Sequence, residues 1–281
     1  MTRKTRTERD SLGTVEVPSG ALYGAQTQRA VDNFKISELS LPEHFITTLA
    51  QIKAASALAN AELGLLSRDY AEAIVTAADR ISAGEHLDQF PVDVFQTGSG
   101  TSSNMNMNEV LSSLVKQEIG IRLHPNDHIN MSQSSNDVIP TCIHVSNLLM
   151  LENRLLPALR HLVGRLTRKR YEVADVVKTG RTHLMDAMPI RMDQELAAWQ
   201  QQIEDNLTRL ENIRPRLTQL AQGGTAVGTG VNAPPTFARL FCRYLSTRSG
   251  LTVKPAASHF SAQATQNTAL ELSGQLKTCA P

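Results

Sequence analysis

Hydrophobic residues recur at helical spacing over most of the chain. Between residues 42 and 63 they are separated by steps of three and four, the period of an amphipathic helix, and Pro42 suits its first turn. A second pattern of this kind follows Asp69 and Glu72, which resemble a capping box, and ends at Gly84. The pattern predicts two successive helices.

The part of the chain before these helices has a different character. Residues 1–40 show little periodicity and contain turn-forming residues at Pro18 and Gly20, so we expect an irregular leader. Apolar spacing returns in residues 110–119 and predicts a third helix that Gly120 stops.

Longer helical patterns occupy the second half. Residues 137–178 are helical in composition and are interrupted only by Pro140 and Pro157, whereas the preceding part alternates short helices with polar loops. We therefore predict a mainly α fold, with a small helical N-terminal domain at residues 1–136 and a long-helix bundle at residues 137–281.

A heptad repeat runs through residues 193–221 and predicts a helix that packs lengthwise in that bundle. Its two seams are formed by Leu196, Ile203, Leu210 and Leu217, and by Trp199, Asn206, Ile213 and Leu220. We expect Asn206, the polar residue on the seams, to set the register, and Pro215 to bend the helix near its end. A further stripe begins at Ala269, and the sequence stops within it. We therefore expect an incomplete bundle and a C-terminally shortened version of a longer protein.

Composition narrows the classes of function. A hydrophobic fraction of 41% and a charged fraction of 20% are ordinary for a globular protein, and an aromatic fraction of 4% favours helices packed by aliphatic side chains. A net charge of +1 gives no strong electrostatic attraction for nucleic acid or acidic lipid. No apolar run approaches the ~20 residues of a membrane helix. Three widely spaced cysteines disfavour a disulfide framework or zinc site and fit a reducing cytoplasm.

Two polar loops that precede helices are candidate anion sites. Residues 98–108 combine glycines with neutral donors such as Ser99 and Thr101 just before a helix, whose N-terminus favours anions. An ordinary capping loop is the alternative, and the absence of G-K-[ST] argues against a nucleotide phosphate. Residues 124–137 supply a second set of neutral donors suited to a small carboxylate.

A metal site is the alternative for the second loop. Its possible ligands lack a recognised spacing on one helix face, so we disfavour metal binding. These residues are His124, Asp127, His128 and Asp137.

The third loop, residues 179–192, contains the candidate proton-transfer residue. His183 follows Thr182 and lies between Arg181 and Asp186 in sequence, and histidine titrates nearest neutrality. A solvated or structural histidine is the alternative from these residues alone.

The fourth loop, residues 223–230, is rich in glycine. Together with Ala233 it superficially matches a dinucleotide fingerprint, but a long helix precedes it instead of a strand, so a tight turn between helices is expected. A serine nucleophile is also disfavoured, because no G-x-S-x-G elbow is present.

Taken together, the four loops resemble class II fumarate hydratase of the fumarase/aspartase superfamily, and the resemblance extends over essentially the whole chain. The motifs that carry it are Gly98–Glu109, Ser132–Asp137, Gly180–Asp186 and Gly223–Gly230, with Asp10–Pro18 and Leu22–Arg29 at the start. Aspartases share much of this pattern. Ser135, where aspartases commonly have threonine, and residues 25–28 look more like fumarase.

The resemblance implies a fumarase/aspartase-like homotetramer with a shared helix bundle, and reversible addition of water to fumarate to give L-malate without a metal or other cofactor. It implies that His183 transfers a proton and that Thr182 contacts substrate from a neighbouring subunit. The residues that would bind a substrate carboxylate are Ser99, Gly100, Thr101, Ser134, Ser135 and Asn136, and those of a secondary carboxylate site are His124, Pro125, Asn126 and Asp127.

Two departures from the family pattern bear on function. His128 stands where the family usually has a second acidic residue, which puts the secondary site in question. The family's Gly-Ser-Ser-x-Met-Pro-x-Lys-x-Asn loop, which carries the catalytic serine, is absent from these residues, so we expect the 281-residue chain alone to be inactive. Aspartate ammonia-lyase activity and a non-catalytic assembly partner are the alternatives.

Overall fold

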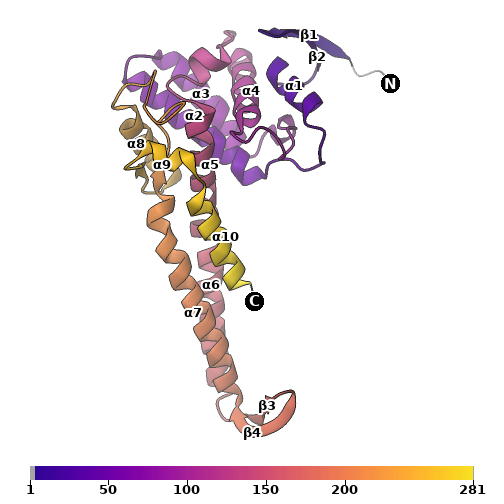
Figure 1. The fold of residues 1–281 in the computed structure, drawn as a ribbon, viewed down its shortest axis with the longest axis vertical. Coiled ribbons are helices and arrows are strands. Elements are labelled where there is room, and N and C mark those ends of the chain that lie inside the picture. Colours follow the sequence, from indigo (N-terminus) through magenta and orange to yellow (C-terminus); the bar gives the residue numbers. More distant parts are fainter. Residues whose placement is uncertain (1–3, 281) are drawn as a thin grey trace. The chain divides into compact units, whose positions relative to one another are not determined.

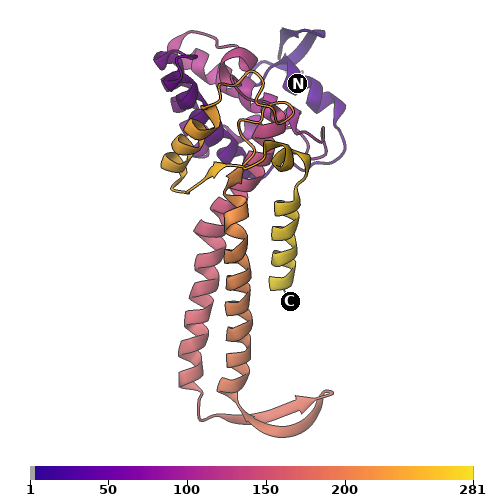
Figure 2. The same ribbon diagram turned by 60° about the vertical axis from the view of Figure 1, so that its left-hand side comes forward.

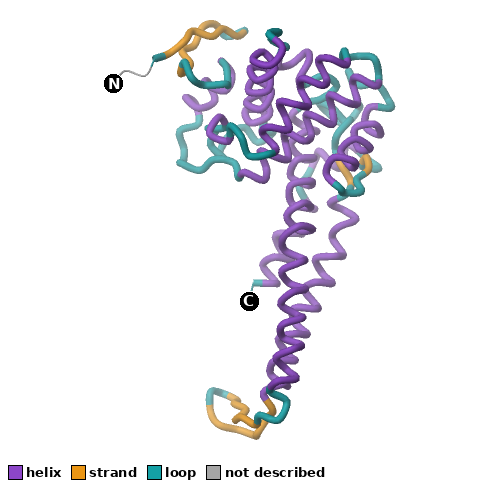
Figure 3. The backbone as a smooth tube through the Cα atoms, turned by 180° about the vertical axis from the view of Figure 1, so that it is seen from behind, coloured by secondary structure: helices purple, strands orange, loops and turns teal. Residues whose placement is uncertain are grey.

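The computed structural model describes residues 4–280, and it is mainly helical, as the hydrophobic pattern predicts (Figures 1 and 3). Its contacts divide the chain into two compact units. Unit 1 contains residues 1–146 and 218–266, and unit 2 contains residues 147–217 and 267–281. The domain boundary expected after residue 136 remains a prediction. Within residues 4–280, no helix combines the length and apolar character needed to cross a membrane.

The core of unit 1 is built around helix α2 (Glu43–Glu62), which packs against α3 (Arg68–Ser82) and α8 (Phe237–Ser249). Small and aliphatic residues fill nearly the whole surface of α2, so that Ile52, Ala55 and Ala59 are fully buried. Both predicted helices of this region are confirmed. Their close packing is possible because alanine lets neighbouring backbones approach.

The capping box expected at Asp69 and Glu72 is wrong. Helix α3 begins one residue earlier, and its N-cap is Ser67, whose hydroxyl accepts a hydrogen bond from the Tyr70 backbone N–H at 3.3 Å. The serine side chain thus binds a first-turn backbone N–H group that has no partner within the helix.

The irregular leader expected for residues 1–40 is also wrong. Strands β1 (Thr5–Asp10) and β2 (Gly13–Pro18) form an antiparallel hairpin, and helix α1 (Ala25–Asn33) follows. The Arg6 guanidinium fixes this region by donating to the carbonyls of Ala21 at 2.7 Å and Tyr23 at 2.8 Å. Strand β1 is entirely polar, so a search for alternating apolar residues could not detect it.

Two helices of unit 1 begin at candidate loops. Helix α4 (Thr101–Ile119) starts well before the predicted 110–119 and ends at Gly120 as expected, and α5 (Ser135–Met150) follows the second loop. Short elements complete the unit's connections: η1 (Leu87–Gln89), η2 (Pro125–Ile129), β5 (Gln219–Leu220), β6 (Lys254–Pro255) and α9 (His259–Ala264).

Unit 2 is organised around the longest helix of the described residues, α7 (Met192–Leu217). Helices α6 (Leu156–Glu172) and α7 lie side by side, and α10 (Asn267–Cys279) packs on α7 (Figure 2). A π-helical turn, η3 (Leu151–Leu155), precedes α6. The seams of α7 are buried only in its second half, from Asn206 to Leu217, and Leu220 lies in β5.

The polar loop expected at residues 179–192 is instead a β-hairpin. Strands β3 (Val177–Thr182) and β4 (Met185–Arg191) pair antiparallel, with an irregularity between Thr179 and Arg181. The preceding helix therefore ends at Glu172 and does not continue to residue 178.

Candidate active site

The candidate site in unit 1 is built first from the N-terminus of α4. Gly100 caps this helix in the left-handed region, at φ +64°, and a Cβ atom on it would lie 2.9 Å from Ile139 Cγ1. Glycine is therefore needed both for the backbone conformation and for the close approach of α4 to α5. Just outside, the hydroxyls of Ser99 and Thr101 lie 2.9 Å apart and both residues are exposed.

The start of α5 brings the second set of donors to the same place. Ser135 is buried, and its hydroxyl accepts a hydrogen bond from Asn104 Nδ2 of α4 at 3.0 Å. Asn136 is exposed and donates from Nδ2 to the Ala226 carbonyl at 2.7 Å. The structure thus joins the starts of α4 and α5 to the glycine-rich loop.

Asp137 holds that third segment in place. Its buried carboxylate accepts hydrogen bonds from the backbone N–H groups of Ser134 at 2.9 Å, Gly223 at 3.0 Å and Thr225 at 2.9 Å. Burial raises the pKa of Asp137, and these backbone donors oppose that rise because they favour the carboxylate. The glycine-rich loop therefore connects β5 to α8 as a segment anchored on the first turn of α5.

This arrangement suits an anion. Two helix N-termini meet, and the backbone N–H groups of each first turn give it a partial positive charge. Helix α4 has no acidic residue in its first turn, and the acidic residue in the first turn of α5, Asp137, is already occupied by backbone donors. The exposed hydroxyl and amide groups of Ser99, Thr101 and Asn136 are neutral donors of the kind that bind a carboxylate.

The proposed secondary-site residues form the π-helical turn η2. His124 Nδ1 lies 3.2 Å from the Asp127 backbone N and 3.1 Å from Asp127 Oδ2. His128 closes the turn, because its Nδ1 accepts from the His124 backbone N–H at 2.9 Å and its ring lies edge-on to Tyr70. The unusual histidine at position 128 thus has a structural role in η2.

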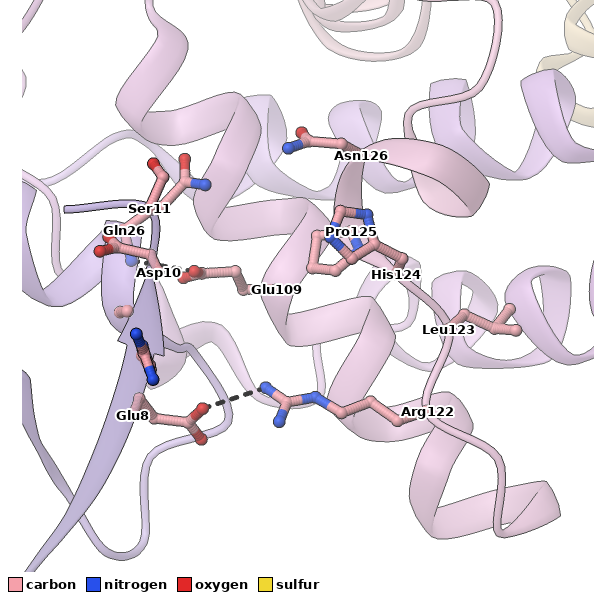
Figure 4. A pocket seen from close by; sticks show the side chains of 12 residues that line it. Glu8, Asp10, Ser11, Gln26, Glu109, Arg122, Leu123, His124, Pro125 and Asn126 are labelled. Atoms are coloured by element: carbon pink, nitrogen blue, oxygen red, sulfur yellow. Dashed lines mark hydrogen bonds and ion pairs between the residues drawn. The ribbon is translucent and has the colours of Figure 1, made fainter. Parts of the chain in front are cut away.

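A cavity of about 550 Å³ lies beside this turn (Figure 4). Its lining combines acidic, basic and polar groups, which include Glu8, Glu109, Arg122, His124, Pro125 and Asn126. Arg122 pairs with Glu8 at 3.3 Å, and Asp127 is not part of the lining. Three of the four predicted secondary-site residues therefore border one cavity.

Thr182 and His183 belong to unit 2. They lie at the tip of the β3–β4 hairpin, where His183 at φ +49° and Leu184 at φ +64° form the two-residue turn. Such turns prefer Asn-Gly, so leucine in this conformation is strained, and strained residues concentrate at functional sites. Both Thr182 and His183 are exposed, and Arg181 pairs with Asp186 across the strands at 3.4 Å.

Three buried polar residues around these loops were not identified from the sequence. Lys53 and Asn60 of α2 contact the second loop, and Glu109 of α4 accepts hydrogen bonds from the start of α1. The available signal was weak: Lys53 and Asn60 are seven residues apart, hence on one face of a helix whose other positions are mostly apolar.

Comparison with known proteins defines the class. The lyase family model matches residues 13–281, so the chain belongs to the lyase family. The mainly helical, fumarase-like fold is confirmed by a class II fumarase from Schistosoma mansoni, which has a TM-score of 0.93 and 38% identity and covers 98% of this chain and 62% of its own. A fumarate lyase:delta crystallin from Brucella melitensis has a TM-score of 0.92 and 39% identity, covering 98% and 61% respectively.

The names of the curated relatives are more specific than the description of the lyase family. Fumarate hydratase class II 2 of Pseudomonas aeruginosa is 52% identical over 276 residues, which are 98% of this chain and 60% of the relative. Fumarate hydratase class II of Halobacterium salinarum is 52% identical over 269 residues, or 94% of this chain and 57% of the relative. The resemblance to class II fumarate hydratases is confirmed, and the chain spans about 60% of the length of the curated relatives it matches.

Proposed function

We propose that the protein is a fumarate hydratase that interconverts fumarate plus water and L-malate. The observation that carries this proposal is the meeting of the α4 and α5 N-termini, whose neutral donors suit a carboxylate. The 52% identity to proteins named class II fumarate hydratase supports the same chemistry.

In this proposal, the unit 1 residues bind one carboxylate of the substrate. Thr101 and Ser99 donate from their hydroxyls at the start of α4, where Gly100 allows the backbone to approach closely. At the start of α5, Ser134 and Ser135 donate from their hydroxyls and Asn136 donates from its amide. Donors that are fixed before the substrate arrives need not reorganise during the reaction.

His183 transfers the proton of the water or departing hydroxyl, and Thr182 contacts the substrate. In the dehydration direction, the serine base that the family carries on the loop absent from these residues takes a proton from the carbon beside one carboxylate. The C–O bond of the neighbouring carbon breaks, and the hydroxyl takes a proton from His183 and leaves as water. Proton removal builds a doubly charged aci-carboxylate, so donors placed around it stabilise the transition state more than the ground state. Hydration runs the same steps in reverse.

The oligomeric state, cofactor requirement, substrates and location are proposed from the similarity to class II fumarate hydratases. We propose a homotetramer that needs no metal or other cofactor, with fumarate and L-malate as small dicarboxylate substrates and with a cytoplasmic location. His124, Pro125, Asn126 and Asp127 form the proposed secondary carboxylate site at the turn η2.

The experiment extends the chain to the length of its relatives. Residues 1–280 are joined to the remaining C-terminal segment of the Pseudomonas aeruginosa relative, and ultraviolet absorbance of fumarate is followed after addition of L-malate. We expect turnover by the fusion, and none by the added segment alone. Thr101→Val keeps the side-chain shape but removes one donor, and should lower kcat by about 10²–10³.

The alternatives give distinct results. Ammonia release from aspartate without conversion of malate would make the protein an aspartate ammonia-lyase. A fusion that assembles with native helix content but converts neither substrate would support a non-catalytic role and refute the proposal. Thr236→Val, at a hydroxyl before α8 and outside the candidate site, is the matched control and should leave kcat unchanged.

A further inference from the structure

A buried lysine lies behind the second loop of the candidate site. The Lys53 side chain is fully buried on α2, with apolar neighbours in sequence at Ile52 and Ala54. Its Nζ donates to Asn130 Oδ1 at 2.8 Å and to Gln133 Oε1 at 3.1 Å. The Lys53 amine therefore fixes the side chains of Asn130 and Gln133, at the two ends of a short segment that lies just before α5.

Asn60 holds the same loop two turns further along α2. Its Nδ2 donates to the Met131 carbonyl at 2.9 Å, and its Oδ1 accepts from the Ser132 hydroxyl at 2.7 Å. Ser132 adopts φ +60°, a conformation that a non-glycine residue keeps only when its surroundings hold it. Lys53 and Asn60 of helix α2 thus hold residues 130–133 in place through four side-chain hydrogen bonds.

The contacts continue from Lys53 to the proposed substrate site. Asn130 Oδ1 also accepts from Asn104 Nδ2 at 3.2 Å, and that amide donates to Ser135 Oγ at 3.0 Å. Asn130 Nδ2 in turn donates to the Gln133 carbonyl at 3.2 Å, immediately before Ser134. The carboxylate-binding donors are therefore connected to Lys53 through Asn130 and Asn104.

Burial of a lysine at this position costs free energy, because its charged form loses its hydration. Burial lowers the pKa of Lys53 to about 7, and the Asp137 carboxylate that faces it opposes the fall. The Cys142 thiol also faces Lys53, and burial raises the pKa of that thiol. An apolar side chain of similar length could fill the space without this desolvation cost. A neutral amine still has two N–H donors, so both hydrogen bonds are available in either protonation state.

We infer that Lys53 is a positioning residue that holds the loop presenting Ser134, Ser135 and Asn136 to the substrate carboxylate. This inference rests on the proposed function for its substrate, whereas the positioning itself concerns the loop alone. Lys53 acts through Asn130 and Gln133 and does not touch the substrate.

The test measures hydrogen–deuterium exchange of residues 130–136 in the 281-residue chain. Lys53→Met removes the amine but keeps an unbranched side chain, and we expect loop exchange to become about tenfold faster, as for the loss of one hydrogen bond to a charged group. Ile52→Ala, a buried change on the same helix without a polar contact, is the control. Compared at matched global stability, it should leave loop exchange unchanged.

A second arm adds fumarate. Fumarate should slow exchange of residues 134–136 in the fusion extended to full length, and Lys53→Met in that fusion should require about tenfold more fumarate for the same protection. If fumarate protects no residue of the fusion, the proposed substrate fails while the loop measurement still decides the role of Lys53. Equal loop exchange in Lys53→Met and Ile52→Ala at matched stability would overturn the inference.

Discussion

At the scale of single residues, buried polar side chains fix the loops of the candidate site. Asp137 binds three backbone N–H groups from the second loop and the glycine-rich loop, and Lys53 binds two side chains of the second loop. Each replaces water lost on folding with a defined set of partners, so each determines one loop conformation. These buried groups therefore fix the loops that carry the exposed donors proposed to meet the substrate.

Gly100 gives a direct test of the approach of α4 to α5. Gly100→Ala places a Cβ 2.9 Å from Ile139 and strains φ, so we expect a loss of roughly 2–4 kcal/mol in the free energy of unfolding. Gly120→Ala is matched in φ, at +71°, but meets nothing within 4 Å. It should cost only about 1–2 kcal/mol in urea unfolding. Equal losses in the two variants would contradict the close approach.

Lys53 should also leave a signature in the pH dependence of stability. Its pKa is about 7 in the folded chain and 10.5 ordinarily, so between these values the unfolded state binds one more proton. Linkage then makes the stability of the unmodified chain rise with pH relative to Lys53→Met, by up to about 1.4 kcal/mol per pH unit. Below the folded pKa the difference should be constant. Urea unfolding from about pH 6 to about pH 9 measures this slope, and parallel profiles would refute it.

The contrast between Thr101 and Lys53 shows how much of the site the sequence could reveal. Thr101 and Asn136 are in polar stretches just before or at the start of helices, where their chemistry is visible in the local sequence. Lys53 lies in an apolar helix, and its partner Asn130 is 77 positions away. Such a contact depends on tertiary packing, so neither periodicity nor composition could predict it.

At the scale of elements, the starts of α4 and α5 create the candidate site, and a side chain of α4 caps a further helix, α1. Its N-cap, Gly24, has no side chain to accept a hydrogen bond, and the buried Glu109 carboxylate of α4 accepts instead from the backbone N–H groups of Gly24, Gln26 and Thr27. The negative charge also complements the positive end of the α1 dipole.

Removal of this carboxylate should therefore release α1. Glu109→Ala leaves three backbone N–H groups and the Thr27 hydroxyl without their acceptor, and should lower the free energy of unfolding by about 3 kcal/mol. Glu118→Ala removes an exposed carboxylate from the same helix and should change it by less than about 0.5 kcal/mol. Chemical denaturation with circular dichroism compares the two variants. Similar losses would show that Glu109 does not cap α1.

The strands that the hydrophobic pattern did not predict share one property. Hydrophobic periodicity located α2, α3 and α7 because each buries an apolar face. Strands β1 and β3 are polar and largely exposed, so their pairing leaves no alternation of apolar residues to detect. The β3–β4 turn, His183-Leu184, also lacks the Asn-Gly pair that normally signals a hairpin.

At the scale of the whole molecule, unit 2 carries much exposed apolar surface. The exposed fraction is 52% for Trp199, 69% for Leu270 and 75% for Met188. Monomeric proteins rarely expose many large apolar side chains on one set of elements, and such surfaces mark interactions with other chains. This surface is consistent with the proposed homotetramer, in which long helices of several copies would pack together.

Trp199, the single tryptophan of the chain, reports on that association. Its ring is half-exposed in one copy, so burial between copies should shift its fluorescence to shorter wavelength, and dilution should reverse the shift as light scattering falls. Trp199→Glu should prevent association in light scattering, because a charge buried without a partner is strongly unfavourable. Gln202→Glu places the same charge at an exposed polar position of α7 and should leave association intact. A monodisperse monomer with concentration-independent emission would refute self-association through these helices.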